Sequence, residues 1–216
     1  MTSPPQPEAL ADLLGALAYG QLSAFDRLAD DARLAPTLAG RAEMSWMAAL
    51  EIGSYRRLAD RIIAVGADPE QAMEPFVAAV DAFHALTQPT TWLESVVKAY
   101  VGDGIAADFY REVARLVDPE TGALIWDVLA EDRRAEFAVR EVRAALAVDP
   151  AQGGRLALWA RRLVGEAISQ AQHVLAERDS LVRLIMAEST DLAAVAALMS
   201  RITARHDERM RALGLA

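Results

Sequence analysis

The sequence of 216 residues contains no cysteine and a single lysine, Lys98. Without cysteine the chain can form no disulfide, no thiolate metal site and no cysteine nucleophile. It also lacks an apolar run approaching the roughly 18 residues that a membrane-spanning helix requires. Its proline-rich start, MTSPPQPEAL, has neither the basic nor the apolar region of a signal peptide. We therefore expect a soluble, cytoplasmic protein with no membrane partner.

Aromatic residues make up only 6% of the chain, although 53% of its residues are hydrophobic. Alanine and leucine supply much of this apolar fraction, which favours helices over sheets. The length is sufficient for one substantial core, so we expect a single domain over residues 1–216. A formal net charge of −9 argues against a nucleic-acid partner, because a polyphosphate backbone would be repelled.

Apolar residues recur at intervals of three and four along most of the chain, which is the period of amphipathic helices. The pattern predicts long helices over 8–34, from a Thr37 cap to 65, over 91–117 and over 120–148. Residues 69–88 are expected to form a shorter crossover that Pro75 interrupts. Two more helices are expected at 155–187 and from ESTD, residues 188–191, to 213. The prediction is an all-α four-helix bundle over residues 8–148, extended by C-terminal helices over residues 152–213.

Polar residues interrupt the apolar lines of the four predicted bundle helices at matching places. Gln21 lies 30 residues before Glu51, and Asp103 lies 28 residues before Glu131. Glu51 and Glu131 are 80 residues apart, so the two halves of the chain are in register. In bundles with one long crossover, such positions hold two carboxylates and two Glu-x-x-His pairs that bind a dinuclear metal centre.

The sequence departs from that metal-binding pattern at three of its six positions. Ser54 and Arg134 stand where the pattern has histidine, and an amide, Gln21, replaces one carboxylate. Glutamine and serine are weak ligands for iron or manganese, and arginine cannot lose its proton to coordinate a metal. The remaining positions keep carboxylates that are competent as ligands, namely Glu51, Asp103 and Glu131.

Three carboxylates inside a bundle are costly unless a positive charge compensates them. A guanidinium can bind carboxylates bidentately in the space of a dication. One hypothesis is therefore that Arg134 pairs with the acids and that Gln21 and Ser54 complete a metal-free polar network. In the alternative, Ala135 takes the inward position and Arg134 lies on the surface.

Other polar features have weaker functional interpretations. The Gly-Asp-Gly segment at 102–104 lies inside a predicted helix, which indicates close packing or a functional need because glycine disfavours helices. Two interpretations of Glu166 and Gln170 are open: they line a cavity, or Glu166 pairs with Arg162. The histidines are not at metal-ligand spacing and are expected at the surface or its boundary: His84, His173 and His206.

Three segments resemble a family of actinobacterial ferritin-like proteins grouped with the MiaE-like tRNA hydroxylases: AYGQLSAFDRLADDARLAPTLAGRAEM, VKAYVGDGIAADFYREVARL and LALWARRLVGEAISQAQ. The resemblance covers nearly the whole chain. It implies a ferritin-like four-helix bundle and, in relatives with all six ligands, a diiron centre that activates oxygen to hydroxylate a modified adenosine in tRNA. Such relatives carry Glu at the position of Gln21 and His at the positions of Ser54 and Arg134. The resemblance therefore implies a degenerate diiron site here, with no cofactor bound.

These residues lead us to expect a non-catalytic binding or structural module, with no catalytic residue and an unidentified small molecule or protein as its partner. The alternative is an active non-haem oxygenase of the tRNA-modifying type, with an unorthodox or single-metal site held by Glu51, Asp103 and Glu131. A third possibility is a structural homodimer, for which the long C-terminal helices would supply the interface.

Overall fold

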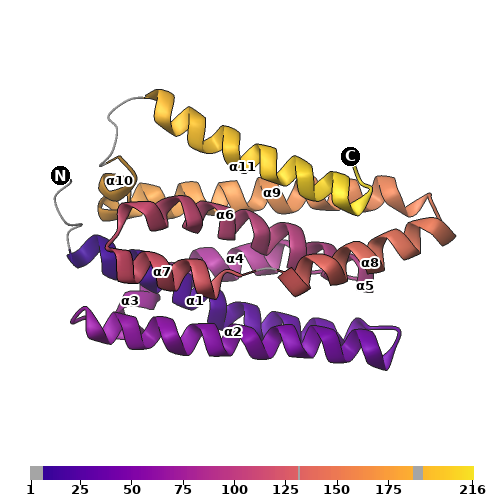
Figure 1. Ribbon diagram of the computed structural model, residues 1–216, viewed down its shortest axis with the longest axis horizontal. Helices are drawn as coiled ribbons and strands as arrows, with labels where there is room; N and C mark the ends of the chain where they lie inside the picture. Colours follow the sequence, from indigo (N-terminus) through magenta and orange to yellow (C-terminus); the bar gives the residue numbers. More distant parts are fainter. Residues whose placement is uncertain (1–6, 131, 187–191) are drawn as a thin grey trace.

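The computed structural model describes residues 7–130, 132–186 and 192–216, and it is built from helices in each of these ranges (Figure 1). The first pair is α1 (Pro7–Asp31) and α2 (Leu38–Ala64), which run antiparallel along one edge of the molecule. Thr37 caps α2, because its side-chain oxygen accepts a hydrogen bond from the Gly40 N–H at 3.0 Å. Leu13, Leu14 and Leu17 of α1 are almost completely buried, as the apolar period predicts.

The crossover consists of α3 (Pro69–Met73), a 3-10 turn over Glu74–Phe76 that contains Pro75, and α4 (Val77–Leu86). Asp68 caps α3 by accepting a hydrogen bond from the Gln71 N–H at 2.9 Å. Phe76 is 1% exposed, and α4 packs against both α1 and α9. The crossover is therefore part of the core and contributes side chains to the interior of the bundle.

The second pair of helices differs in detail from the two continuous helices that the sequence predicts. The first member contains α5 (Trp92–Val97), a π-helical segment (Lys98–Gly102) and α6 (Asp103–Val113). The second member is divided into α7 (Pro119–Val128) and α8 (Asp132–Val148). Arg111 donates a hydrogen bond to the carbonyl oxygen of Leu129, just after α7. This tertiary bond satisfies a terminal carbonyl without a further turn of helix.

The C-terminal part contains α9 (Gln152–Glu177), α10 (Asp179–Met186) and α11 (Leu192–Leu213), whereas a single helix over 155–187 was expected before the last one. The helix breaks at Arg178, where Arg178 and Ser180 both hydrogen-bond the buried carboxylate of Asp12 on α1. Residues two apart face different sides of a continuous helix, so the break allows both to reach one acid. The expected ESTD start of the last helix lies outside the described residues.

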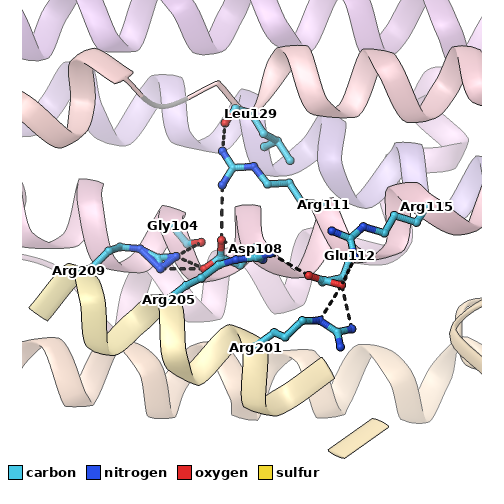
Figure 2. A network of polar contacts seen from close by, with 9 residues as sticks. All are labelled: Gly104, Asp108, Arg111, Glu112, Arg115, Leu129, Arg201, Arg205 and Arg209. Carbon is cyan, nitrogen blue, oxygen red and sulfur yellow. Dashed lines mark hydrogen bonds and ion pairs between the residues drawn. The ribbon is translucent and has the colours of Figure 1, made fainter. Parts of the chain in front are cut away.

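Charged side chains attach α11 to α6 (Figure 2). Arg209 donates to Asp108 with an Nη1–Oδ2 distance of 2.8 Å, and Arg201 and Arg205 each donate to Glu112 at 3.0 Å. The arginines are spaced four residues apart on α11 and the acids four apart on α6, so the two rows face each other. Asp108 is 1% exposed, which makes this network an internal attachment of α11.

The glycines at 102–104 have packing roles in this region. The Arg209 side chain crosses Gly104, and a Cβ atom at Gly104 would lie 2.5 Å from Arg209 Nε. Arg209 Nη2 also donates to the Gly104 carbonyl at 2.7 Å. At Gly102 a Cβ atom would lie 3.5 Å from the ring of Phe83. A side chain at position 104 would therefore obstruct the packing of Arg209 of α11 against α6.

Gly15 brings α1 against the backbone of α3, which provides a test of this packing. A Cβ atom at Gly15 would overlap the carbonyl group of Ala72. We expect Gly15→Ala to lower the free energy of unfolding by about 1–3 kcal/mol, even though alanine is about 1 kcal/mol better than glycine in a helix. Urea denaturation measures the change. Gly53→Ala on α2 is the matched control, because a Cβ atom there meets nothing within 4 Å. Equal effects of the two substitutions would contradict the close α1–α3 contact.

The arrangement confirms the predicted all-α, ferritin-like fold class, with a central crossover and additional C-terminal helices. Within the described ranges, no helix combines the length and the apolar sequence that crossing a membrane requires.

Candidate functional site

A cavity of about 400 Å³ lies among the helices of the bundle. Its walls include side chains from both helix pairs, from the crossover helix α4 and from the C-terminal helices α9, α10 and α11. Most of these side chains are apolar, such as Leu17, Phe76 and Val113. Cavities of roughly 300–1,000 Å³ with apolar walls and a few polar groups are typical of small-molecule sites.

Arg134 joins two carboxylates at the wall of this cavity. Its Nη2 group donates a hydrogen bond to Glu51 Oε1, and its Nη1 group donates to Asp103 Oδ2 at 3.3 Å. The three residues come from α8, α2 and α6, so three separate helices meet at this ion-pair cluster. The Arg134 side chain is 19% exposed, and its guanidinium faces the interior of the bundle, the orientation that the metal-free hypothesis requires.

Glu51 is the most deeply buried member of the cluster, with 3% of its side chain exposed. Burial raises the pKa of its carboxyl group, and the neighbouring charge and hydrogen bond of Arg134 oppose that rise. Asp103 is more accessible, with 25% of its side chain exposed. Glu51 therefore depends on Arg134 for compensation more strongly than Asp103 does.

The other predicted site residues fall into different places. Gln21 lines the cavity, and its Oε1 atom is buried without a hydrogen-bond partner among the described residues. Ser54 is half-buried one turn beyond Glu51 on α2, and it is not part of the cavity wall. Glu131 lies outside the described residues. Of the proposed cavity pair on α9, Gln170 lines the wall and Glu166 does not.

His84 corrects the expectation that the histidines lie at the surface or its boundary. It is 8% exposed, lines the cavity from α4, and its Nδ1 atom has no partner within the described part of the chain. Burial, together with the charges of Lys98 and Arg27, lowers the pKa of the imidazole to about 3, so the ring is neutral at pH 7. The four-residue steps from Phe76 through residue 80 to His84 place it on the buried face of α4, a signal that could have revealed it.

The other two histidines differ from each other. His173 is exposed on α9, as expected. His206 on α11 is half-buried and lines the cavity, and its buried Nδ1 atom also has no partner in the described ranges. The single lysine is internal as well: Lys98 begins the π-helical segment and donates to the Thr87 carbonyl at 2.8 Å. Burial lowers the pKa of Lys98 to about 8, although Asp103 and Asp31 oppose the shift.

A smaller cavity of about 10 Å³ adjoins the main one, and the two share Ala24, His84 and Asp103 in their walls. Lys98 and Asp31 also line this smaller cavity. Burial raises the pKa of Asp31 to about 6. The small cavity therefore joins the His84 imidazole, the lysine and the carboxylates into one polar region beside the apolar space.

The residues of this polar region do not fit a dinuclear metal centre. A guanidinium bonded to Glu51 and Asp103 uses the carboxylate oxygens that would face metal ions, and it brings a fixed positive charge to the same place. Among the described residues, no three His, Asp, Glu or Cys side chains are grouped closely enough to hold a metal ion.

Comparison with protein families agrees with this architecture. Residues 6–188 match a family model described as a ferritin-like domain of actinomycetes. The chain belongs to this family. The match to the ferritin-like domain extends from α1 through α10 and ends before α11, so the helix that carries His206 lies beyond it. A search of curated proteins gave no match.

Proposed function

We propose that this ferritin-like protein is a non-catalytic relative of the MiaE-like hydroxylases, in which an ion-pair cluster replaces the diiron centre and the internal cavity binds a small molecule. The observation that carries the proposal is the position of Arg134, hydrogen-bonded to Glu51 and Asp103 at the cavity wall. A cation that is always protonated supplies the compensation that metal ions would otherwise provide.

The identities of the substituted residues support the same proposal. Ser54 cannot replace an imidazole ligand, and Gln21 offers only a neutral amide. The Glu51–Arg134 pair is largely removed from solvent, so any metal that used Glu51 would first have to displace the guanidinium. An apolar cavity lies beside the cluster, which suits a protein that binds a small molecule without oxygen chemistry.

Metal analysis tests this proposal directly. The full chain, produced in medium supplemented with iron and then with manganese, is expected to retain well under one metal ion per molecule. Native protein that holds about two irons per chain would overturn the proposal, because that is the content of a dinuclear site. Inductively coupled plasma mass spectrometry of gel-filtered protein gives the count, and added chelator should leave the thermal unfolding midpoint unchanged.

A second candidate is an active hydroxylase with an unorthodox or single-metal site. Two carboxylates beside an apolar cavity, Glu51 and Asp103, are the observation that favours it. One tightly held iron per chain that is lost in Glu51→Gln, but kept in the control Glu70→Gln at an exposed glutamate of α3, would select this candidate. The net charge of −9 argues against tRNA as the substrate of such an enzyme, because a polyphosphate backbone would be repelled.

A further inference from the structure

We propose that the cavity binds an uncharged, largely apolar small molecule that carries a hydroxyl group, and that Gln21 and His84 are its hydrogen-bond partners. The inference rests on the proposed function, because it takes Arg134 and not metal ions as the partner of the carboxylates. It adds the chemical class of the ligand and the residues that recognise it.

The size and walls of the cavity set the apolar part of the ligand. A volume of about 400 Å³ compares with about 30 Å³ for a water molecule in the liquid, so the cavity has room for at least about a dozen non-hydrogen atoms. Leu13, Leu17, Phe76 and Leu184 contribute almost fully buried apolar side chains to its wall. An apolar cavity of this size favours a hydrocarbon chain or ring system over a sugar or nucleotide.

The charges around the cavity exclude a charged ligand. The Arg134 guanidinium is already bonded to Glu51 and Asp103, so an anionic group brought to it would also face two carboxylates. The Lys98 ammonium donates to the Thr87 carbonyl and lies in the same polar region as Asp103. Arg27 and Asp31 add one charge of each sign to that region. Among the described residues, the three cations and three carboxylates that line the two cavities balance, which leaves no net charge to compensate an ion taken out of water.

Unpartnered polar atoms identify where the polar group of the ligand binds. Gln21 Oε1 and His84 Nδ1 are buried at the cavity wall and have no hydrogen-bond partner among the described residues. His206 Nδ1 is a third such atom at the same wall. The large majority of buried side-chain polar atoms are paired, so unpartnered atoms gathered beside one cavity indicate a bound group that completes them. His84 is 8% exposed, and its neutral ring both donates and accepts, as an amide side chain does. A hydroxyl group of a ligand matches these partners, because it can donate to Gln21 Oε1 and either donate to or accept from the imidazole.

The positions of Gln21 and His84 allow one polar group of a ligand to contact both residues. Gln21 lies one helical turn before Ala24, and Ala24 lines both cavities together with His84. The amide and the imidazole are therefore presented to the same part of the space from α1 and α4. On another wall, α11 contributes Met199, Ile202 and His206. This wall lies outside residues 6–188, which match the family model.

Two fluorescent probes with the same ring system test the charge preference. N-phenylnaphthylamine is uncharged, whereas anilinonaphthalene sulfonate carries an anionic group. We expect the native full chain to bind the uncharged probe saturably with one site, and to bind the sulfonate at least about tenfold more weakly, a difference of about 1.4 kcal/mol. Absence of saturable binding by the uncharged probe, or equal affinity for the sulfonate, would overturn the inference.

A pair of glycine substitutions locates the bound probe. Gly20 lines the cavity, and a Cβ atom added there meets nothing within 4 Å, so Gly20→Leu should fold and fill part of the space. We expect at least a tenfold loss of affinity for N-phenylnaphthylamine. Gly53→Leu is the matched control, since Gly53 is exposed on α2 and is also free of contacts within 4 Å. Equal affinities of both variants would place the probe elsewhere and reject the cavity as its site.

The hydroxyl preference is tested by displacement of the probe. Dodecanol should displace N-phenylnaphthylamine at a concentration at least about tenfold lower than dodecanoate does. In Gln21→Leu and His84→Phe, which remove the two polar partners, dodecanol should lose several-fold more affinity than the probe does. Stronger displacement by dodecanoate would assign the site to anions and reject the proposed class. Failure of these assays with a metal-free protein contradicts the ligand class alone, whereas two irons per chain contradict the proposed function.

Discussion

Replacing Arg134 by methionine is expected to lower the free energy of unfolding by about 3–5 kcal/mol at pH 7, the typical cost of leaving one member of a buried ion pair without its partner. Glu51, which is 3% exposed, would lose the guanidinium that bonds it. Asp103 is more exposed and can be solvated in its place. Urea denaturation measures the change, and Arg56→Met, at an exposed arginine on α2, should stay within about 0.5 kcal/mol of the native protein.

The pH dependence identifies Glu51 as the cause. Burial already raises the pKa of Glu51 above its ordinary value of 4.5, and loss of Arg134 removes the influence that opposes this rise. A carboxyl group whose pKa is raised in the folded state contributes stability below pH 4.5 that is lost as the pH rises through the folded-state pKa. The deficit of Arg134→Met should therefore be largest near neutral pH and should shrink as the pH approaches 4.5.

A double variant separates the lost pair from a general disturbance of α8. Glu51→Leu combined with Arg134→Met removes both charges, and replacement of a buried ion pair by apolar side chains is often neutral or stabilising. We expect the double variant to recover most of the stability that Arg134→Met loses, which a double-mutant cycle quantifies. A pH-independent loss below about 1 kcal/mol in Arg134→Met would contradict the compensating role of the guanidinium.

Restoring the missing ligands should convert the chain into an iron-binding protein. Gln21→Glu, Ser54→His and Arg134→His together supply the carboxylate and the two imidazoles that the six-position pattern lacks. We expect about two irons per chain after anaerobic reconstitution with ferrous iron, against none in the native protein. The geometric basis is that residues three apart share a helix face, so the imidazole at position 54 would lie beside Glu51.

Stability provides a second readout for the restored site. The triple variant without iron carries extra negative charge and no guanidinium, so it should unfold more easily than the native chain. Iron that binds only the folded state should raise its unfolding midpoint and leave that of the native chain unchanged. Arg134→Met alone, which frees Glu51 and Asp103 but adds no imidazole, is the control and should bind no iron. A triple variant that folds, by circular dichroism, and binds no iron would show that the six positions are wrongly assigned.

Local sequence signals predicted most of the helices, because helix formation depends on residues only a few positions apart in the chain. The apolar period and the Thr37 cap predicted α1 and α2 closely, and Pro75 marked the interruption in the crossover. The breaks after Val128 and at Arg178 were not predicted. In both regions an arginine takes part in a distant hydrogen bond, from Arg111 to Leu129 or from Arg178 to Asp12, and no local propensity records such a bond.

The candidate site was predictable to the extent that it repeats a spacing. Similar intervals in the two halves of the chain, 30 and 28 residues, singled out Glu51, Asp103 and Arg134 before their contacts were known. The same reasoning left two orientations open for Arg134, and it assigned His84 to the surface or its boundary. The inward guanidinium and the buried imidazole follow from packing of α8 and α4 against other helices, which a single-helix period does not specify.

By itself, the sequence determined that the chain is helical and that it lacks cysteine chemistry, and it predicted that half of the expected metal ligands are replaced. Only the tertiary structure decided that Arg134 joins Glu51 to Asp103, that a cavity remains beside them, and that α11 helps to enclose it. The physical reason is distance along the chain. Arg134 and Glu51 are 83 residues apart and Arg209 and Asp108 are 101 apart, so their meeting depends on how whole helices pack.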